Sequence, residues 1–347
     1  MKLARDGEPA DQIAAVVPIG VAFPSARPRL GEGLRRSVAV VPPLALAIVL
    51  PLVLNDYYLY LATQVAIYAI ASLGLDVVFG RTGQLSLSHA SFFGLGAYAA
   101  ALMAAASWSS PVLQIVVVIA VAIAAGAIVA VPTLRLSGLR LALVTLLFGE
   151  LFVWAINHTG DLTGGSQGMS VPPLEIGRFS SVDPVDGYVL SVIAAAAATL
   201  LIVQLSRTQL GRNMLAVRDS ELAAVSVGIR IVQTKIVAFI LSAILAGLAG
   251  WLYAYVAGFV SPSTFDLFGS VNFLVAVILG GTGRVLGAWL GAAYIVLLPE
   301  LFTALGYTNL FPLLGGAVLI TVTLLLPGGL SEGLSRLARA VSAKRHG

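Results

Sequence analysis

Residues 236–257 read IVAFILSAILAGLAGWLYAYVA and contain no charged side chain. A helix of about 20 apolar residues is long enough to cross the hydrocarbon core of a bilayer. Lipid offers no hydrogen-bond partners, so a spanning segment must satisfy its backbone polar groups internally, as a helix or within a closed barrel. The apolar residues here are continuous rather than alternating, which argues against a barrel strand. This stretch therefore predicts a transmembrane helix.

The composition of the whole chain agrees with this prediction. Of the 347 residues, 59% are apolar and 10% are charged, whereas soluble globular chains carry about 25% charged residues. We expect an all-α integral membrane protein of about ten transmembrane or half-spanning helices, some of them broken. Span 269–281 is too short to cross alone, and we interpret it as half of a broken pair around Gly280–Gly283. The expected spans are residues 38–54, 58–79, 87–107, 112–131, 140–157, 188–205, 236–257, 269–281, 285–301 and 311–327.

The distribution of basic residues predicts the orientation, because short cytoplasmic loops collect Lys and Arg. With a cytoplasmic N-terminus, these spans place every Lys and Arg on the inner side except Arg178. The expected parts are a polar cytoplasmic tail (1–37), a transmembrane domain (38–330) with an outer loop (158–187) and an inner loop (206–235), and a basic cytoplasmic tail (331–347). The outer loop is acidic, and it either contacts an extracytoplasmic partner or is a solvated connector. Its acidic residues are Asp161, Glu175, Asp183 and Asp186.

Small residues recur every four positions in several spans, and such stripes let helix backbones approach closely in lipid. We interpret them as helix-packing surfaces. The stripes are Ala246, Gly250, Ala254 and Gly258, then Ala122, Gly126 and Ala130, and the pair Gly287 and Gly291.

Glycine-rich interruptions occur at Gly80–Gln84 and Gly280–Gly283. Irregular backbone at membrane depth is tolerated where protein or a water-filled cavity surrounds it, and transporters place such breaks near their substrate. Glu150 is the one deeply placed acid, either hydrogen-bonded inside the bundle or a polar contact on a translocation path. So few buried ionisable groups indicate that energy enters elsewhere. The candidate pathway residues are Gln84, Ser86, His89, Gly94, Glu150, Gly280 and Gly281.

Metal and thiol sites are not expected. The chain has no cysteine, and its three histidines, His89, His158 and His346, have no metal-ligand spacing. A lone histidine in such a chain is more often structural than a ligand.

The inner loop 206–235 predicts two short helices. Asp219 is expected as the N-cap and Gly228 as the C′ residue of the second helix, with Glu221 near its positive end. Residues 214–217 predict the other helix just before it. Leu222 and Val225 would form an apolar face that docks into a partner's groove, although the loop could also be a plain solvated connector.

Two groups of motifs carry a resemblance to a known family. Residues 221–228, ELAAVSVG, resemble the EAA-type loop of ABC importer permeases, in which a Glu, nearby alanines and a later Gly form the coupling helix. Residues 83–90 (GQLSLSHA) and 92–98 (FFGLGAY) resemble the signature of LivM-type branched-chain amino acid permeases. Further matching stretches are 134–140, 145–150, 163–168, 235–250, 279–283 and 327–330.

The resemblance implies a permease subunit, not an enzyme, that forms a path for Leu, Ile and Val across a bacterial inner (plasma) membrane. It implies a homologous second permease as heterodimer partner, two ATP-binding cassette ATPases and a periplasmic solute-binding protein, with no nucleic acid. ATP and Mg²⁺ would lie on the ATPases, and this sequence contains no GxxxxGK[ST] phosphate loop. The implied ATPase-coupling residues are Arg212, Arg218, Asp219, Glu221, Leu222, Ala223, Ala224, Val225 and Gly228.

Three other functions stay open. Ser88 stands where the family has Gly, and Leu139 stands where it has an aromatic residue, so the cargo could be urea, a short amide or another small polar solute. An ion-coupled secondary transporter is a further alternative. A membrane enzyme or scaffold is disfavoured because acids, histidines and nucleophiles do not cluster in the sequence.

Overall fold

The computed structural model of the protein describes residues 54–108, 110–133, 136, 138–306, 316, 321 and 329–334. Every described residue belongs to one compact unit, Leu50–Gly347. The expected tail 1–37, nearly all of the expected spans 38–54 and 311–327, and most of the C-terminal tail lie outside the described residues.

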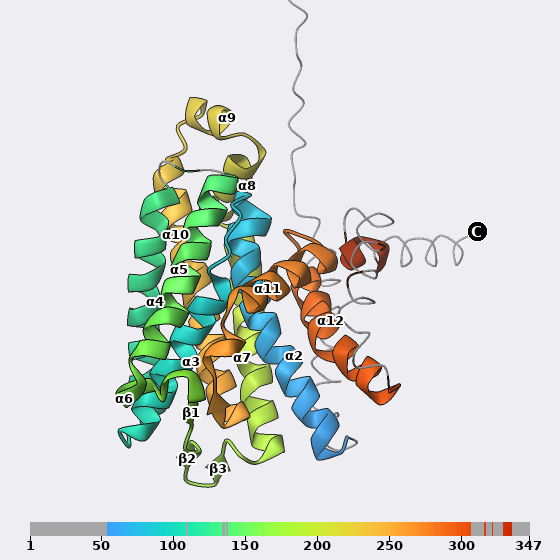
Figure 1. Cartoon of the computed structure of the whole chain (residues 1–347). Coiled ribbons are helices and arrows are strands. Elements are labelled where there is room, and N and C mark those ends of the chain that lie inside the picture. The colour runs from blue at the N-terminus through green and yellow to red at the C-terminus, as the bar shows by residue number, and fades with distance from the viewer. Residues whose placement is uncertain are drawn as a thin grey trace, which may run out of the picture. The chain divides into compact units, whose positions relative to one another are not determined.

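The described elements are almost all helices (Figure 1). The helices are α2 (Asp56–Leu75), the π-helical segment η1 (Asp76–Gly80), α3 (His89–Ala105), α4 (Pro111–Thr133), α5 (Leu139–His158), α6 (Gly160–Thr163), η2 (Gly165–Gln167), α7 (Pro184–Arg207), α8 (Gln209–Asp219), α9 (Glu221–Ser226), α10 (Ile231–Ala257), η3 (Pro262–Thr264), α11 (Leu267–Gly280) and α12 (Val285–Ala304). Two small antiparallel pairs accompany them, β1 (Met169–Ser170) with β4 (Phe259–Val260) and β2 (Glu175–Ile176) with β3 (Phe179–Ser180).

Within the described residues, 7 helical segments are long and apolar enough to cross a membrane, and α3 is a shorter apolar helix. Each expected span between residues 58 and 301 coincides with one of these helices, which confirms the all-α membrane fold. The expected span 269–281 begins too late. Together, η3 and α11 form a segment of 19 residues, Pro262–Gly280, which is long and apolar enough to cross a membrane. Similarly, α10 begins at Ile231, so Lys235 lies inside the helix rather than in the preceding loop.

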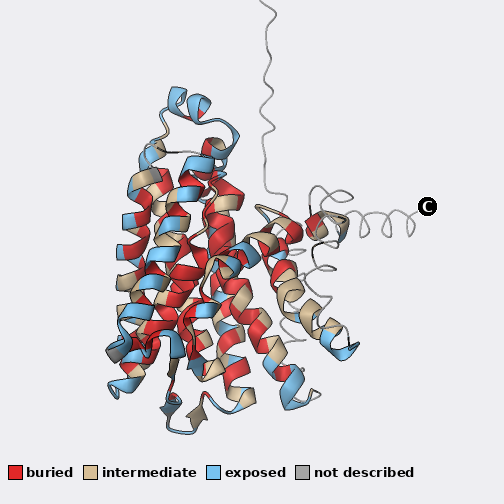
Figure 2. Cartoon of the chain, viewed as in Figure 1, coloured by how far each residue is buried: buried red, intermediate tan, exposed pale blue. Residues whose placement is uncertain are grey.

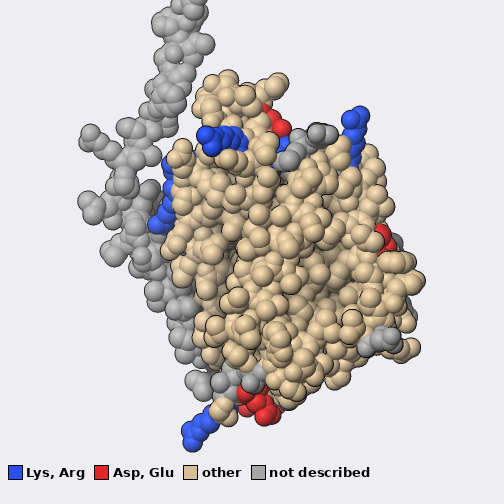
Figure 3. All heavy atoms as spheres, turned by 90° about the vertical axis from the view of Figure 1, so that its left-hand side faces the viewer, with Lys and Arg blue, Asp and Glu red and all other residues tan. Residues whose placement is uncertain are grey.

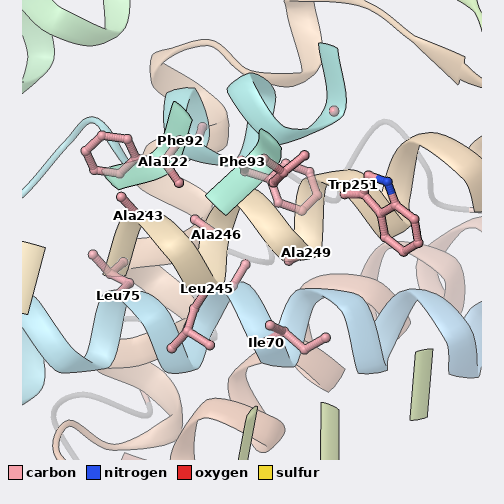
Figure 4. Packing of buried hydrophobic residues seen from close by; sticks show 14 of the residues in the cluster. Ile70, Leu75, Phe92, Phe93, Ala122, Ala243, Leu245, Ala246, Ala249 and Trp251 are labelled. Carbon is pink, nitrogen blue, oxygen red and sulfur yellow. The ribbon is translucent and has the colours of Figure 1, made fainter. Parts of the chain in front are cut away.

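Helix α10 lies at the centre of the packing, against α2, α3 and α4. Small residues make the contact with α3 unusually close. A Cβ atom added to Gly96 would lie 1.9 Å from the carbonyl oxygen of Gly247, and one added to Gly250 would lie 1.8 Å from that of Phe93. Figure 4 shows Phe92 and Phe93 beside the small residues Ala246 and Ala249 of α10. The stripe through Gly250 is therefore a packing surface, as predicted.

The other two small-residue stripes also pack helices together. A Cβ atom on Gly126 of α4 would lie 3.0 Å from the Ala243 Cβ of α10. On α12, a Cβ atom on Gly291 would lie 2.0 Å from the Ala276 carbonyl oxygen of α11. In lipid, the hydrophobic effect does not drive helices together, so their association depends on dispersion contacts. Close backbone approach of this kind strengthens those contacts.

Burial decreases from the middle of the bundle to its outer helices (Figure 2). The outer faces of α4, α5 and α7 are exposed and mainly apolar, with Ile128, Leu147 and Ile193 each more than 60% exposed. Contiguous exposed apolar surface of this extent marks contact with lipid or another chain rather than with water. The bundle therefore has the inside-to-outside pattern of a membrane protein whose surroundings are apolar.

The inner and outer loops lie at opposite ends of the bundle. Figure 1 shows α8 and α9 at the upper end and α6 with the small strands at the lower end. On the face shown in Figure 3, charged side chains gather near the two ends, and Lys and Arg predominate at the upper one. This is the asymmetry on which the predicted orientation rests.

A cysteine introduced at Ser166 will test that orientation, because Ser166 is exposed in η2 and the natural chain has no cysteine. We expect the thiol of Ser166→Cys to react with a membrane-impermeant reagent added outside intact cells. A matched Ser226→Cys variant, exposed on α9 at the other end, should react only after lysis. The reverse labelling pattern would overturn the orientation.

Candidate functional site

The two expected short helices of the inner loop form, and one residue joins them. Ser220 has an extended backbone, with φ −163° and ψ 115°, and its hydroxyl oxygen accepts a hydrogen bond from the Ala223 amide at 3.3 Å. Ser220 is therefore the N-cap of α9, and the prediction of Asp219 in that role is wrong by one residue. Asp219 cannot serve as the cap because it still has a place in the last turn of α8.

The predicted end of the second helix is confirmed. Gly228 has φ +80°, a left-handed conformation that glycine adopts without steric cost. Its amide donates to the Val225 carbonyl at 2.9 Å, and the Ile229 amide donates to the Ala224 carbonyl at 3.0 Å. These two bonds form a Schellman motif, which places Gly228 at C′.

The short helix α9 presents an apolar surface to the surroundings. Leu222 is 86% exposed, Val227 73% and Val225 58%, whereas Ala224 is 2% exposed and faces the bundle. Ala223 and the charged residues Arg212, Arg218, Asp219 and Glu221 are exposed around it. Leu222 and Val225, the predicted docking face, are therefore both exposed, and docking through them stays a prediction.

Two hollows lie near α9. One of 560 Å³ is lined by residues that include Glu221, Val225 and Lys235. The other, of 370 Å³, is lined by residues that include Asn213, Gly228 and Gln233. The first hollow is lined by α9 and the start of α10, and the second by α8, the turn after α9 and α10.

Each of the two helices has a polar attachment to the membrane helices. A Glu221 carboxylate oxygen lies 2.8 Å from the Lys235 ammonium nitrogen, with the Lys235 side chain 6% exposed and Glu221 47% exposed. Arg218 of α8 donates a hydrogen bond to the Gly80 carbonyl at the end of η1. Arg212, by contrast, donates to the nearby Arg207 carbonyl at 2.9 Å. We did not predict either long-range attachment, because no sequence pattern pairs these residues.

The predicted pathway residues of the α2–α3 connection are buried inside the bundle. Ser86 and Ser88 share a hydrogen bond of 3.1 Å between their hydroxyls, and no hydrogen bond to the Gln84 amide group occurs among the described residues. This connection is tied to α5, because the Leu87 amide donates to the Thr145 hydroxyl at 2.9 Å. Gly94 is held close to α5 as well, since a Cβ atom there would lie 2.7 Å from the Phe152 ring.

His89 occupies the position of a structural histidine. It is fully enclosed, with one ring nitrogen 2.7 Å from the Ala71 carbonyl of α2 and the other 3.4 Å from the Ser242 hydroxyl of α10. Its ring therefore joins three helices. Gly280 and Gly281 lie at the turn from α11 to α12, where a Cβ atom on Gly280 would lie 1.9 Å from the Gly287 carbonyl oxygen. The role of these residues in a pathway stays a prediction.

Glu150 does not face the interior of this bundle, so that interpretation is wrong. The residue is exposed near the middle of α5, and no hydrogen bond or ion pair joins it to any described residue. It shares its face of the helix with Leu143, Leu147, Leu151 and Trp154, each more than 50% exposed. An ionised acid at this depth is costly against lipid. Its contact with a translocation path remains a prediction.

In the described part of the chain, no three His, Cys, Asp or Glu side chains lie close enough together to hold a metal ion.

Comparisons with known proteins agree with the fold. The family described as "Branched-chain amino acid transport system / permease component" matches residues 57–323. The high-affinity branched-chain amino acid transport system permease protein LivM of Escherichia coli (strain K12) is 32% identical over 86% of this chain and 76% of the relative. The autoinducer 2 import system permease protein LsrC of Enterobacter sp. (strain 638) is 30% identical over 84% of this chain and 86% of the relative. The LivH permease protein of Escherichia coli (strain K12) is 24% identical over 80% of this chain and 97% of the relative. No solved structure matches the chain.

Proposed function

Because this chain belongs to the family of permease components of branched-chain amino acid transport systems and is a permease subunit of an ABC importer, we propose that it forms the path for Leu, Ile and Val across the bacterial inner membrane. The observation that supports this cargo is the family match over residues 57–323, together with 32% identity to the LivM protein. A second candidate keeps the ABC architecture and imports another small polar solute, such as urea or a short amide. The 30% identity to a permease named for autoinducer 2 import supports this second candidate.

Uptake into vesicles that contain the complete transporter distinguishes these cargos. Labelled leucine should accumulate when ATP is supplied inside with the ATPases, and unlabelled isoleucine or valine in excess should suppress the signal. Urea and short amides should leave it unchanged. Uptake of urea or an amide without uptake of leucine would favour the second candidate.

We propose that α8 and α9 are the coupling helices that dock onto an ATPase subunit, with both termini of the chain in the cytoplasm. The support is the exposed apolar group Leu222, Val225 and Val227, with two hollows nearby. A short helix with one apolar face and charges at its rim suits docking into a groove. In this proposal the subunit pairs with a second, homologous permease, two ATPases and a periplasmic binding protein, and ATP and Mg²⁺ are held by the ATPases.

The energy source separates this proposal from an ion-coupled transporter. Blocking ATP hydrolysis while the membrane potential is held constant should stop uptake. Continued uptake under that block, with loss of uptake when the ion gradient is dissipated, would favour a secondary transporter instead. Alternating access would then follow from ion binding rather than from movement of α8 and α9.

We propose that Glu150 faces a water-containing path rather than lipid, because its charge has no partner in the described part of the chain. In the assembled transporter, the thiol of Glu150→Cys should react with a charged, water-soluble reagent, since the reactive thiolate is disfavoured in apolar surroundings and forms more readily beside water. The matched control is Ile193→Cys on α7, which is 62% exposed on an apolar face. Its thiol should stay unreactive, and equal reactivity at both positions would contradict the proposal.

A further inference from the structure

The second membrane helix ends in an unusual way. After Leu75, α2 changes into the π-helical segment η1, which covers Asp76–Gly80. π-Helical turns are rare and occur frequently at functional sites. The end of η1 lies against the turn between α11 and α12, where a Cβ atom added to Gly80 would lie 2.6 Å from the Gly283 amide nitrogen. The two interrupted spans therefore approach each other closely through the backbone of Gly80 and Gly283.

A buried carboxylate joins these two segments. Asp76 is 1% exposed, and one of its carboxylate oxygens accepts a hydrogen bond from the Gly283 amide at 2.6 Å. Its other oxygen lies 3.5 Å from the Arg81 guanidinium, which in turn donates to the Ser206 hydroxyl of α7 at 2.5 Å. Interactions of charged groups are strong where water is excluded, so the ends of α2, α7 and α11 form one connected unit.

Arg218 brings the coupling helices into contact with this unit. Its guanidinium donates to the Gly80 carbonyl, and a Cβ atom on Gly283 would lie 3.2 Å from the same guanidinium nitrogen. The absence of a side chain at Gly283 leaves space for Arg218, and the absence of one at Gly80 leaves space for the Asp76 carboxylate and the Gly283 amide. One residue of α8 therefore contacts both interrupted spans at the point where they meet.

The attachment of α9 is separate. Glu221 reaches Lys235 of α10, on the other side of the connection at Ser220. Movement of the two coupling helices could thus be passed to two different parts of the bundle, to α10 through Glu221 and to the η1 and α11–α12 contact through Arg218.

We propose that Arg218 is a positioning residue that passes the displacement of α8 to the contact between Gly80 and Gly283, so that η1 and the α11–α12 turn move together with the coupling helices. This inference rests on the proposed role of α8 and α9 in docking the ATPase. It identifies the two glycine-rich interruptions as the parts of the path that receive this movement. Asp76 keeps the two interruptions together while they move.

The first test replaces the guanidinium and compares uptake with ATP hydrolysis in the complete, reconstituted transporter. Arg218→Gln should lower the amount of solute taken up per ATP by about tenfold, the order of a typical coupling free energy, while hydrolysis continues. Arg218→Lys should recover part of the loss, because an ammonium can still donate to the Gly80 carbonyl. The matched control is Arg284→Gln, which removes the same charge from an exposed position next to Gly283 and should leave the ratio unchanged.

A covalent replacement of the contact gives the second test. The Arg218 Cβ lies 3.8 Å from the position of a Cβ on Gly83, a separation typical of disulfides. The double variant Gly83→Cys with Arg218→Cys should therefore form a disulfide between α8 and the connection that follows η1. Uptake per ATP should be restored in the oxidised protein and lost again on reduction of the same preparation, which removes differences in folding yield from the comparison.

The two tests separate the inference from the proposed function. Loss of uptake in the oxidised double variant, or an unchanged ratio in Arg218→Gln, would show that Arg218 does not pass on movement in this way. If the unsubstituted transporter itself showed no ATP-dependent uptake, the proposed function would fail instead.

Discussion

Replacing Glu221 with Lys will uncouple ATP hydrolysis from transport while the subunit remains inserted in the membrane. In the present chain the Glu221 carboxylate lies 2.8 Å from the Lys235 ammonium, which is 6% exposed. The substitution places two ammonium groups side by side and leaves Lys235 without its counter-charge. Because removing one partner of a buried pair costs about 3–5 kcal/mol and an exposed pair contributes at most about 1 kcal/mol, this half-buried pair should lie between them.

We expect that cost to release α9 from α10 rather than to unfold the bundle, because α9 makes few contacts outside α8 and α10. Uptake by Glu221→Lys should fall more than tenfold, equivalent to about 1.4 kcal/mol of lost coupling. The measurements are the amount of subunit in the membrane, the ATPase rate and the uptake of labelled leucine. Normal uptake by this variant would refute the coupling role of Glu221.

The charge-swapped double variant, Glu221→Lys with Lys235→Glu, distinguishes two roles of Glu221. If the carboxylate only attaches α9 to α10, the reversed pair should restore most of the uptake. If the carboxylate contacts the ATPase directly, the double variant should remain as defective as Glu221→Lys alone. The structure favours restoration of uptake, since the Glu221 carboxylate is already paired with the Lys235 ammonium.

Replacing Gly250 with Leu should strongly destabilise the folded protein. A Cβ atom at this position would lie 1.8 Å from the Phe93 carbonyl oxygen and 3.0 Å from the Ala97 amide nitrogen. These are backbone atoms of α3, so no side-chain rotation can make room. Overpacking of a core costs about 1–3 kcal/mol where neighbours can shift, and separating α3 from α10 along their whole contact should cost more.

The expected result is little or no folded Gly250→Leu protein, measured as the monodisperse fraction after detergent extraction and as thermal stability. Ala124→Leu is the matched control, because it adds bulk at an exposed position of α4. That variant should extract and melt like the unsubstituted chain. Equal stability of the two variants would mean that α3 and α10 do not approach as closely as described.

The helices could be predicted from the sequence because each apolar run is continuous and bounded by polar or glycine-rich residues. The small-residue stripes could be predicted as packing surfaces because residues four apart lie on one side of a helix. The cap of α9 was wrong by one residue, since Asp219 and Ser220 are both good N-cap residues and the sequence does not show where α8 ends. Only backbone geometry separates them.

The direction in which Glu150 points could not be predicted, because α5 is apolar on nearly all sides and its pattern does not distinguish an inner from an outer face. The attachments of the coupling helices were also hidden. Arg218 and Gly80 are 138 positions apart in the chain, and each occurs in a stretch that would fold locally without the other. Such contacts depend on how the helices pack, which local patterns do not specify.

The single residue that joins α8 to α9 has a mechanical consequence. Ser220 closes the first helix through its amide, which donates to the Ala216 carbonyl at 3.0 Å, and opens the second through its hydroxyl. Because no further residue separates α8 from α9, both helices pivot at Ser220. A force applied at Leu222 should therefore rotate α8 about Ser220 and displace the far end of α8.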